Sequence, residues 1–162
     1  MPQKKTIRRA RRDARQGKSP STQAGEFVHD EIKKIRKGEH GARSAKQAIA
    51  IGLNEARRAG VNLKPPKKGS VSEKTRKSAE SALEKGQEHK PVSRKRSRAS
   101  ARALKREPTS TVSHSALSKQ ARTAARKRGA SSRAAAARKA AATKGPRKRS
   151  QAAKKAARTR KA

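Results

Sequence analysis

The chain has 162 residues, and its 48 Lys and Arg against 11 Asp and Glu give a formal net charge of +37 at pH 7. Leu, Ile, Val and Phe number only 16, about a tenth of the chain, which is too little apolar surface to offset the entropy of ordering one large globular domain. We therefore expect a mostly disordered chain whose folded part is a short all-α element. Cysteine is absent, which excludes disulfides and thiolate metal sites.

Residues 1–25 are predicted to be a basic N-terminal arm. The opening MPQKKTIRRARRD is charged but has no apolar stretch behind it, so it does not resemble a secretory signal. No run in the chain approaches the roughly 18 apolar residues of a membrane span. We expect a cytoplasmic protein with no membrane span, whose positive charge is balanced by a polyanion.

Residues 26–64 are predicted to form a helical hairpin, the best-specified fold in the chain. Val28, Ile32 and Ile35 fall on one face of a helix, with Phe27 beside them. The segment KGEHG then indicates a loop, because its two glycines break the helix.

The second helix of the hairpin is expected in ARSAKQAIAIGLNEARRAG, residues 42–60. Ser44 and Gln47 form an S-x-x-Q capping box, and Gly60 stands where a helix ends in the left-handed conformation. Ile51 lies off the apolar face, so it is either a tolerated exposed residue or a contact for a second copy, which leaves homodimerisation through the hairpin open. The predicted hairpin core is Phe27, Val28, Ile32, Ile35, Ile49, Leu53 and Ala56.

Residues 65–107 are predicted to be a polar and basic linker with one weak helix, in SVSEKTRKSAESALEKG. Residues 108–162 form a basic, alanine-rich tail with 17 Lys or Arg and no acid. Its loose repeats begin with serine and continue with alanine and basic residues, which suit helices, but like charges oppose the helix in the free chain. We expect arms that are disordered alone and become helical on a polyanion.

The predicted partner is nucleic acid held by its phosphates. The basic residues of the tail point around the whole helix, so they suit backbone phosphates and not base edges. The chain has no Trp or Tyr and a single Phe, which removes the base stacking that single-strand binders use and favours duplex DNA, with structured RNA as the alternative. The expected phosphate contacts are Arg8, Arg9, Arg11, Arg12, Lys46, Arg57, Arg58, Arg94, Lys95, Arg96, Arg98, Arg122, Arg126, Lys127, Arg128, Arg133, Arg138, Lys139, Arg147, Lys148, Arg149, Lys154, Lys155, Arg158 and Arg160.

An enzymatic site is not expected. The histidines, His29, His40, His89 and His114, lack metal-ligand spacing. The sequence contains neither a phosphate-binding glycine loop nor the glycine-flanked serine of a hydrolase. It therefore predicts no catalytic residue, no metal, no cofactor and no small-molecule substrate.

The segment KQAIAIGLNEARRAG, at 46–60, resembles a family of small basic bacterial proteins, several of which are labelled DNA-binding or plasmid stabilisation proteins. The flanking segments TQAGEFV, RKRSRASARALKRE and SALSKQARTAARKRGA are similar to longer members of that family. The alanine- and lysine-rich end is similar to the tails of linker histones and bacterial histone-like proteins. The resemblance implies bacterial DNA association and supplies no catalytic residue.

These features together predict a histone-like, nucleoid-associated protein that binds duplex DNA without sequence specificity and compacts or bridges it. Plasmid maintenance is a role that the resemblance suggests. Two alternatives stay open: an RNA-binding or RNA-chaperone protein that uses the same charge, and an adaptor whose hairpin docks a protein partner. The DNA-binding and RNA-binding hypotheses place binding in the arms, whereas the adaptor hypothesis places it in the hairpin.

Overall fold

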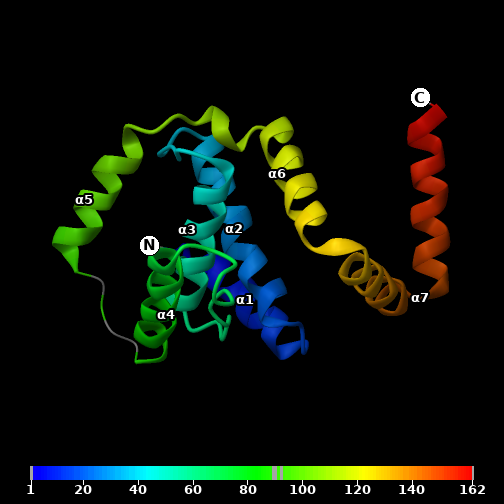
Figure 1. The fold of residues 1–162 in the computed structure, drawn as a ribbon, viewed down its shortest axis with the longest axis horizontal. Coiled ribbons are helices and arrows are strands. Elements are labelled where there is room, and N and C mark those ends of the chain that lie inside the picture. Colours follow the sequence, from blue (N-terminus) through cyan, green and yellow to red (C-terminus); the bar gives the residue numbers. More distant parts are fainter. Residues whose placement is uncertain (1, 89–90, 92, 162) are drawn as a thin grey trace. The chain divides into compact units, whose positions relative to one another are not determined.

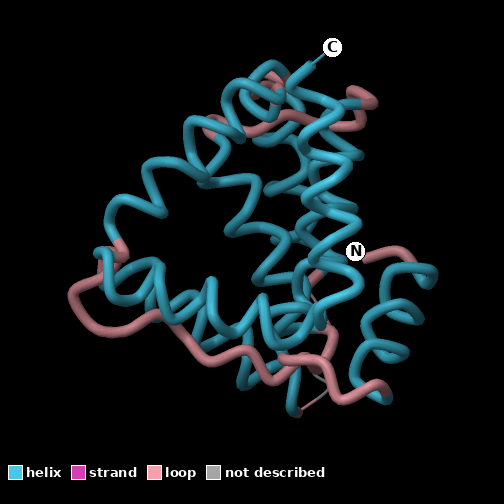
Figure 2. Tube along the Cα trace, turned by 90° about the vertical axis from the view of Figure 1, so that its right-hand side faces the viewer, coloured by secondary structure: helices cyan, strands magenta, loops and turns pink. Residues whose placement is uncertain are grey.

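The computed structural model describes residues 2–88, 91 and 93–161, and this part of the chain contains helices and no strand (Figures 1 and 2). The long C-terminal helix α7 (Gly129–Lys161) is broken at Gly145, whose φ of 67° lies in the left-handed region, just before Pro146. The elements are α1 (Lys4–Arg15), α2 (Pro20–Arg36), α3 (Ala45–Arg58), α4 (Glu73–Gln87), α5 (Arg94–Lys105), the short 3-10 helix η1 (Ser110–Val112), α6 (His114–Lys127) and α7 (Gly129–Lys161).

The expectation of a mostly disordered chain is wrong, because helices cover most of the described residues, including the regions 65–107 and 108–162 that were expected to be linker and disordered tail. In the tail, the high helix propensity of Ala, Arg and Lys outweighs the repulsion between like charges. In the folded part, alanine replaces the large apolar residues that the composition lacks. Eight of the buried apolar residues are Ala10, Ala24, Ala42, Ala45, Ala48, Ala56, Ala79 and Ala82.

Four helices pack in sequence order, and the middle two are the predicted hairpin. The helices α2 and α3 form its two arms, α1 packs against α2, α4 packs against α3, and α1 and α4 do not touch each other. Glycines allow two of these close approaches. A Cβ atom on Gly52 of α3 would lie 2.7 Å from the Cα of Val28, and one on Gly86 of α4 would collide with the carbonyl of Arg57. Small residues therefore let the backbones approach and gain dispersion contacts without large side chains.

The interior consists of two small apolar clusters at opposite ends of the hairpin. The first joins Phe27 and Ala24 of α2 to Ala10 of α1, Ala56 of α3 and the following Val61. Ile7, Leu53, Ala59 and Leu63 pack around it. This cluster lies where α2 begins and α3 ends.

The second cluster lies where α2 ends and α3 begins. It contains Ile35, Ala42, Ala48 and Val112, with Ile32 packed against them. Val112 comes from η1, more than sixty residues after the hairpin turn, and is fully buried.

The predicted hairpin core is distributed over both clusters. Phe27, Ile35 and Ala56 are fully buried. Ile32 and Leu53 are partly buried beside them, while Val28 and Ile49 are half-buried and belong to neither cluster. Ile51, the residue that stood off the predicted face, is also half-buried.

The N-terminal arm is a packed helix that precedes a longer hairpin. The helix α1 buries Thr6, Ala10 and Asp13, and α2 already begins at Pro20 rather than at residue 26. The chain divides into two compact units, residues 1–117 and 118–162, whereas the sequence suggested divisions after residues 25, 64 and 107. None of the described helices is long and apolar enough to cross a bilayer.

Residues 104–112, which we call the clasp, dock on the turn between α2 and α3. Gly41 N–H donates to the Leu104 carbonyl at 2.9 Å, and Ala42 N–H donates to the Pro108 carbonyl at 3.1 Å. A Cβ atom on Gly41 would collide with the carbonyl of Glu107, so the close approach requires glycine at this position.

Side chains complete the clasp. Thr111 Oγ1 donates to the Ala42 carbonyl at 2.8 Å, and Arg36 Nε donates to the Val112 carbonyl at 3.1 Å. Glu107 forms an ion pair with Arg43 at 3.4 Å. The clasp is therefore held by backbone hydrogen bonds, a buried valine and one ion pair.

Candidate nucleic-acid interface

The acidic residues of the chain are largely used inside the folded unit. All 11 lie before residue 108. Glu26 pairs with Arg9 at 2.6 Å, and Asp13 pairs with Lys18 at 2.7 Å. On α4, Arg76 binds both Glu73 and Glu80.

Three further carboxylates meet one lysine where α2, its following turn and α3 come together. Lys34 Nζ lies 3.3 Å from Asp30 Oδ2, 3.9 Å from Glu31 Oε2 and 3.6 Å from Glu55 Oε2. His40 Nε2 lies 3.5 Å from Glu31 Oε1. We call these five residues the buried charge cluster. The described residues contain no group of three or more His, Cys, Asp or Glu that could hold a metal ion.

Burial and the neighbouring charges together shift two pKa values in this cluster. Burial raises the pKa of Glu31, with Glu55 and Asp30 adding to the rise and His40 and Lys34 opposing it. Burial alone would lower the pKa of Lys34, but Glu55 and Asp30 outweigh it and the pKa is raised. The lysine is therefore held in its charged form by carboxylates that are themselves kept away from the surface.

The exposed face of α1 carries six basic side chains, which we call the α1 stripe: Lys4, Lys5, Arg8, Arg11, Arg12 and Arg15. At 100° per residue they occupy an arc of roughly 120° around the helix. The opposite face is the one that buries Thr6, Ala10 and Asp13. Packing against α2 thus turns the stripe outward and holds its backbone rigid.

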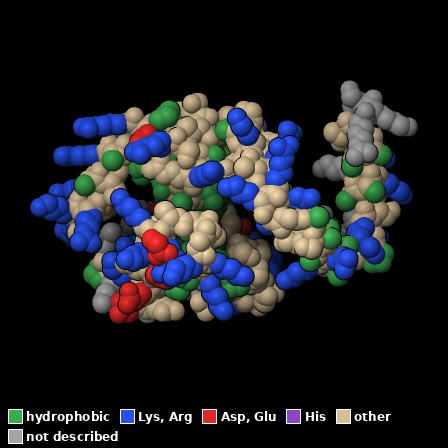
Figure 3. Space-filling view, in the orientation of Figure 1, with side chains coloured by type: hydrophobic (Ala, Val, Ile, Leu, Met, Phe, Trp, Pro, Cys, Tyr) green, Lys and Arg blue, Asp and Glu red, His purple; other side chains and the backbone are tan. Residues whose placement is uncertain are grey.

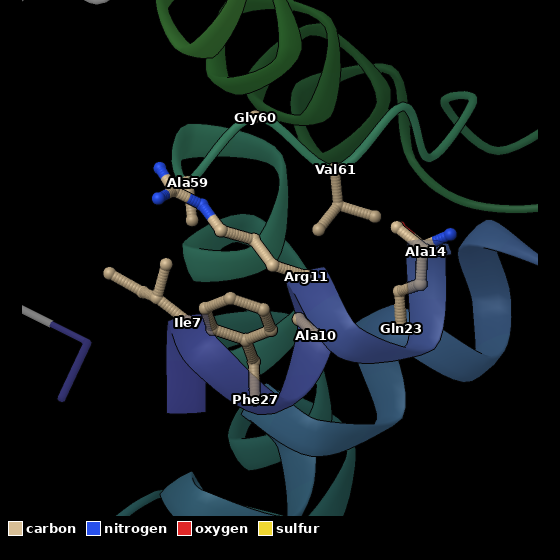
Figure 4. A pocket seen from close by; sticks show the side chains of 9 residues that line it. All are labelled: Ile7, Ala10, Arg11, Ala14, Gln23, Phe27, Ala59, Gly60 and Val61. Atoms are coloured by element: carbon tan, nitrogen blue, oxygen red, sulfur yellow. The ribbon is translucent and has the colours of Figure 1, made fainter. Parts of the chain in front are cut away.

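A cavity of about 250 Å³ lies beside the stripe, between α1, α2 and the end of α3. Apolar side chains such as Ile7, Phe27 and Val61 line it. Figure 4 shows the Arg11 side chain extending across it toward Ala59. Three alanines, Gly60 and Gln23 complete the lining, so the cavity wall supports the stem of Arg11.

The helix α5 carries a second stripe with the same spacing. Arg94, Lys95, Arg98, Arg102 and Lys105 are all exposed, and they occupy an arc of roughly 100°. We call them the α5 stripe. They repeat the spacing of Lys4, Lys5, Arg8, Arg12 and Arg15 in α1. No residue of α5 is buried, so this helix presents its charge without a packed face.

The C-terminal unit adds further basic residues. On α6, Lys119, Arg122 and Arg126 share one exposed face, opposite the half-buried Leu117 and Ala124. On α7 the basic residues are spread around the helix. Those with exposed side chains are Arg133, Arg138, Lys139, Arg147, Arg149, Lys154 and Arg158. The predicted contacts Lys148, Lys155 and Arg160 have side chains outside the described part, as does His89 among the histidines.

Several predicted phosphate contacts make internal side-chain interactions: Arg133 and Arg149 stay exposed while donating to the carbonyls of Ala125 and Gly145 at 3.3 Å, whereas Arg9 and Arg57 are engaged in the packed unit. Arg9 is the residue that pairs with Glu26. Arg57 is only 5% exposed and donates to Asn54 Oδ1 at 2.9 Å and to the carbonyls of Leu63 and Lys64 at 3.1 and 3.4 Å. Burial also lowers the pKa of Arg57. The Arg57 guanidinium therefore binds the chain after α3 to that helix, whereas the side chain of the adjacent Arg58 is exposed.

The remaining predicted contacts lie at the surface, and several basic residues join them. Lys46, Arg96, Lys127 and Arg128 are exposed, as Arg58 is. Sequence reasoning missed Lys4, Lys5, Arg15, Arg102 and Lys105, which a search for basic residues at helical spacing finds. Figure 3 shows Lys and Arg side chains across the visible face, with acidic side chains confined to a few places.

Comparison with known proteins places the N-terminal part of the chain in context. Residues 3–68 match a family of unknown function (DUF6496). This range includes α1 together with both helices of the hairpin, so the α1 stripe lies within the matched segment. No curated protein and no solved structure matches the chain.

Proposed function

We propose that this protein binds duplex DNA without sequence specificity, through contacts between Lys and Arg side chains and backbone phosphates, as a nucleoid-associated protein of the bacterial cytoplasm. Phosphate contacts of this kind supply nearly all non-specific affinity for DNA. The proposal does not rest on the family match, which carries no function.

The observation that carries the proposal is the separation of charge by the fold. Acids are paired in or beside the packed unit, while six basic side chains form one outward stripe on α1. A structural ion-pair network would interleave the two signs on the surface. An outward stripe of one sign, on a helix whose other face is packed, suits a row of phosphates held at fixed spacing.

Duplex DNA is favoured over single strands by the position of the only aromatic residue. Phe27 is fully buried in the first apolar cluster, and the chain has no Trp or Tyr, so no Phe, Trp or Tyr ring is exposed on which an unpaired base could stack. A duplex needs no such ring, because its backbone can be bound from outside. The backbone of structured RNA can also be bound from outside, so the experiment compares a DNA duplex with a structured RNA hairpin.

The experiment removes four charges from the α1 stripe in the full-length protein. The variant carries Arg8→Gln, Arg11→Gln, Arg12→Gln and Arg15→Gln, which preserve helix propensity. Its binding to a labelled DNA duplex is followed by anisotropy at several salt concentrations. If all four side chains contact phosphates, the slope of log K against log salt becomes shallower by about 3–4, at about 0.9 per phosphate.

The matched control removes four exposed charges elsewhere, with Lys67→Gln, Lys68→Gln, Lys74→Gln and Lys77→Gln. We expect it to change the slope by less than half as much. Equal changes in both variants would mean that the charge acts without a defined site. Tighter binding of a structured RNA hairpin at the same salt would assign the protein to RNA.

A further inference from the structure

The α1 stripe and the α5 stripe are attached to different sides of the hairpin. The helix α1 packs against α2, whereas α5 follows α4, which packs against α3. Because α1 and α4 share no contact, the two stripes are carried by separate flanks of the folded unit.

The described elements before and after α5 both contact the hairpin. Before it, Gly86 of α4 packs against the Arg57 carbonyl, at the C-terminal end of α3. After it, the clasp docks beside Gly41 and Ala42, ahead of the N-terminal end of α3. The segment therefore spans the 14 residues of α3, a length of about 20 Å, without packing on it. Figure 1 shows the chain after α5 running to the turn between α2 and α3, where the clasp docks.

The only acid that follows Glu88 in the sequence is Glu107, and it is used in the clasp with Arg43. The α5 stripe thus has no acid on its own helix to neutralise it. The clasp holds its C-terminal end, its face is open, and its spacing copies that of the α1 stripe.

We propose that the α5 stripe is a second duplex-binding site and that one molecule uses the two stripes to bridge two separate DNA segments. This inference rests on the proposed function, since both sites take the same ligand. When a segment of a long DNA molecule occupies the α1 stripe, other segments of the same molecule meet the α5 stripe at a raised effective concentration, so a weaker second site can still close a bridge. The tail then adds affinity for either segment without defining the bridge.

A two-duplex capture assay tests the bridge with the full-length protein. One duplex is fixed to beads, protein is loaded on it, and a second, labelled duplex is added. The α5 variant carries Arg94→Gln, Arg98→Gln, Arg102→Gln and Lys105→Gln, and the α1 variant carries Lys4→Gln, Arg8→Gln, Arg12→Gln and Arg15→Gln. At equal loading on the first duplex, we expect each variant to capture the second duplex at least five-fold less than the control with Lys67, Lys68, Lys74 and Lys77 changed to Gln.

The outcomes separate the competing explanations. If the α5 variant captures as much second duplex as the control variant, the tail supplies the second site and the inference is overturned. If an equal mixture of the α1 and α5 variants regains capture, two copies make the bridge and the single-molecule inference is overturned. Wild-type protein that loads but captures nothing removes only this inference, whereas failure to load removes the proposed function itself.

Discussion

Glu31 shows how strongly one residue can depend on its surroundings in this protein. It is 1% exposed and faces Lys34, Asp30, Glu55 and His40 from α2, α3 and the turn between them. Burial raises its pKa above the ordinary value of 4.5. Ionised Glu31 therefore costs stability at neutral pH, and the cost is relieved as pH falls through the raised pKa toward 4.5.

Replacement of Glu31 by Gln removes this titration. Above the raised pKa, the buried charge of ionised Glu31 destabilises the wild-type protein, and the variant lacks this charge. Below pH 4.5 Glu31 is protonated, and this destabilisation disappears. The free energy of unfolding of Glu31→Gln, relative to that of wild type, is therefore expected to be higher at about pH 8 than at about pH 4. Urea unfolding at both pH values measures the difference, and the exposed Glu39→Gln serves as the control. A difference that does not change with pH would contradict the assigned environment.

At the scale of elements, the clasp makes a long-range contact depend on one apolar side chain. Val112 is fully buried, whereas Val71 is 37% exposed. Trimming Val112 to Ala removes buried methyl groups from the second cluster, at a cost on the order of 1–3 kcal/mol. Local opening of the clasp should become correspondingly more frequent.

Limited trypsin digestion reports this opening, because Lys105 and Arg106 lie within the clasp. We expect Val112→Ala to raise the rate of cleavage at these two residues several-fold, while Val71→Ala leaves it unchanged. Equal rates in the two variants would show that the buried valine does not hold the clasp closed.

The elements differ in how far the sequence reveals them. The hairpin follows from apolar periodicity and its cap: Ser44 Oγ accepts from Gln47 N–H at 3.2 Å, as predicted, and Gly60 has a φ of 91°. The Gln47 side chain accepts from Arg43 N–H instead of Ser44 N–H. The weak helix lies inside its predicted segment and begins with a cap at Ser72, and α5 joins it in the region expected to be linker.

Other elements leave no such signal. The buried face of α1 consists of Thr6, Ala10 and Asp13, which no search for large apolar residues detects. Val112 is an isolated apolar residue whose partners lie far away in the sequence, so its burial depends on tertiary structure alone. The same holds for Arg57, whose buried role differs from that of the adjacent Arg58 only because of where α3 places it.

At the scale of the whole molecule, the composition argument failed because it counted only large apolar residues. Alanines make up most of the buried apolar residues in the described chain, and Gly52 and Gly86 let the helix backbones approach. A core of this kind gains packing contacts at low side-chain entropy cost. The excess of basic residues can be counted in the sequence, but the packed structure is required to show that the stripe on α1 faces outward.

The two compact units predict a simple deletion result. The last buried residue of the described chain is Val112, so a chain ending at residue 117 keeps both apolar clusters. We expect it to retain the hydrogen-exchange protection of the Phe27 and Ile35 amides, while its affinity for duplex DNA falls because 17 basic residues are lost. A chain ending at residue 103 lacks the clasp and should lose protection at Ile35 first. Loss of protection in the chain that ends at residue 117 would contradict the division into units.

The clasp also affects how the protein is made. A ribosome releases the chain from its N-terminus, so the first cluster can close once Leu63 has emerged, while the second stays open until Val112 follows. At cellular rates of synthesis that delay is roughly 2–10 s. Each nascent chain therefore exposes α1 while only its first apolar cluster is folded. Chaperones or nucleic acid can bind this partly folded chain before Val112 has been translated.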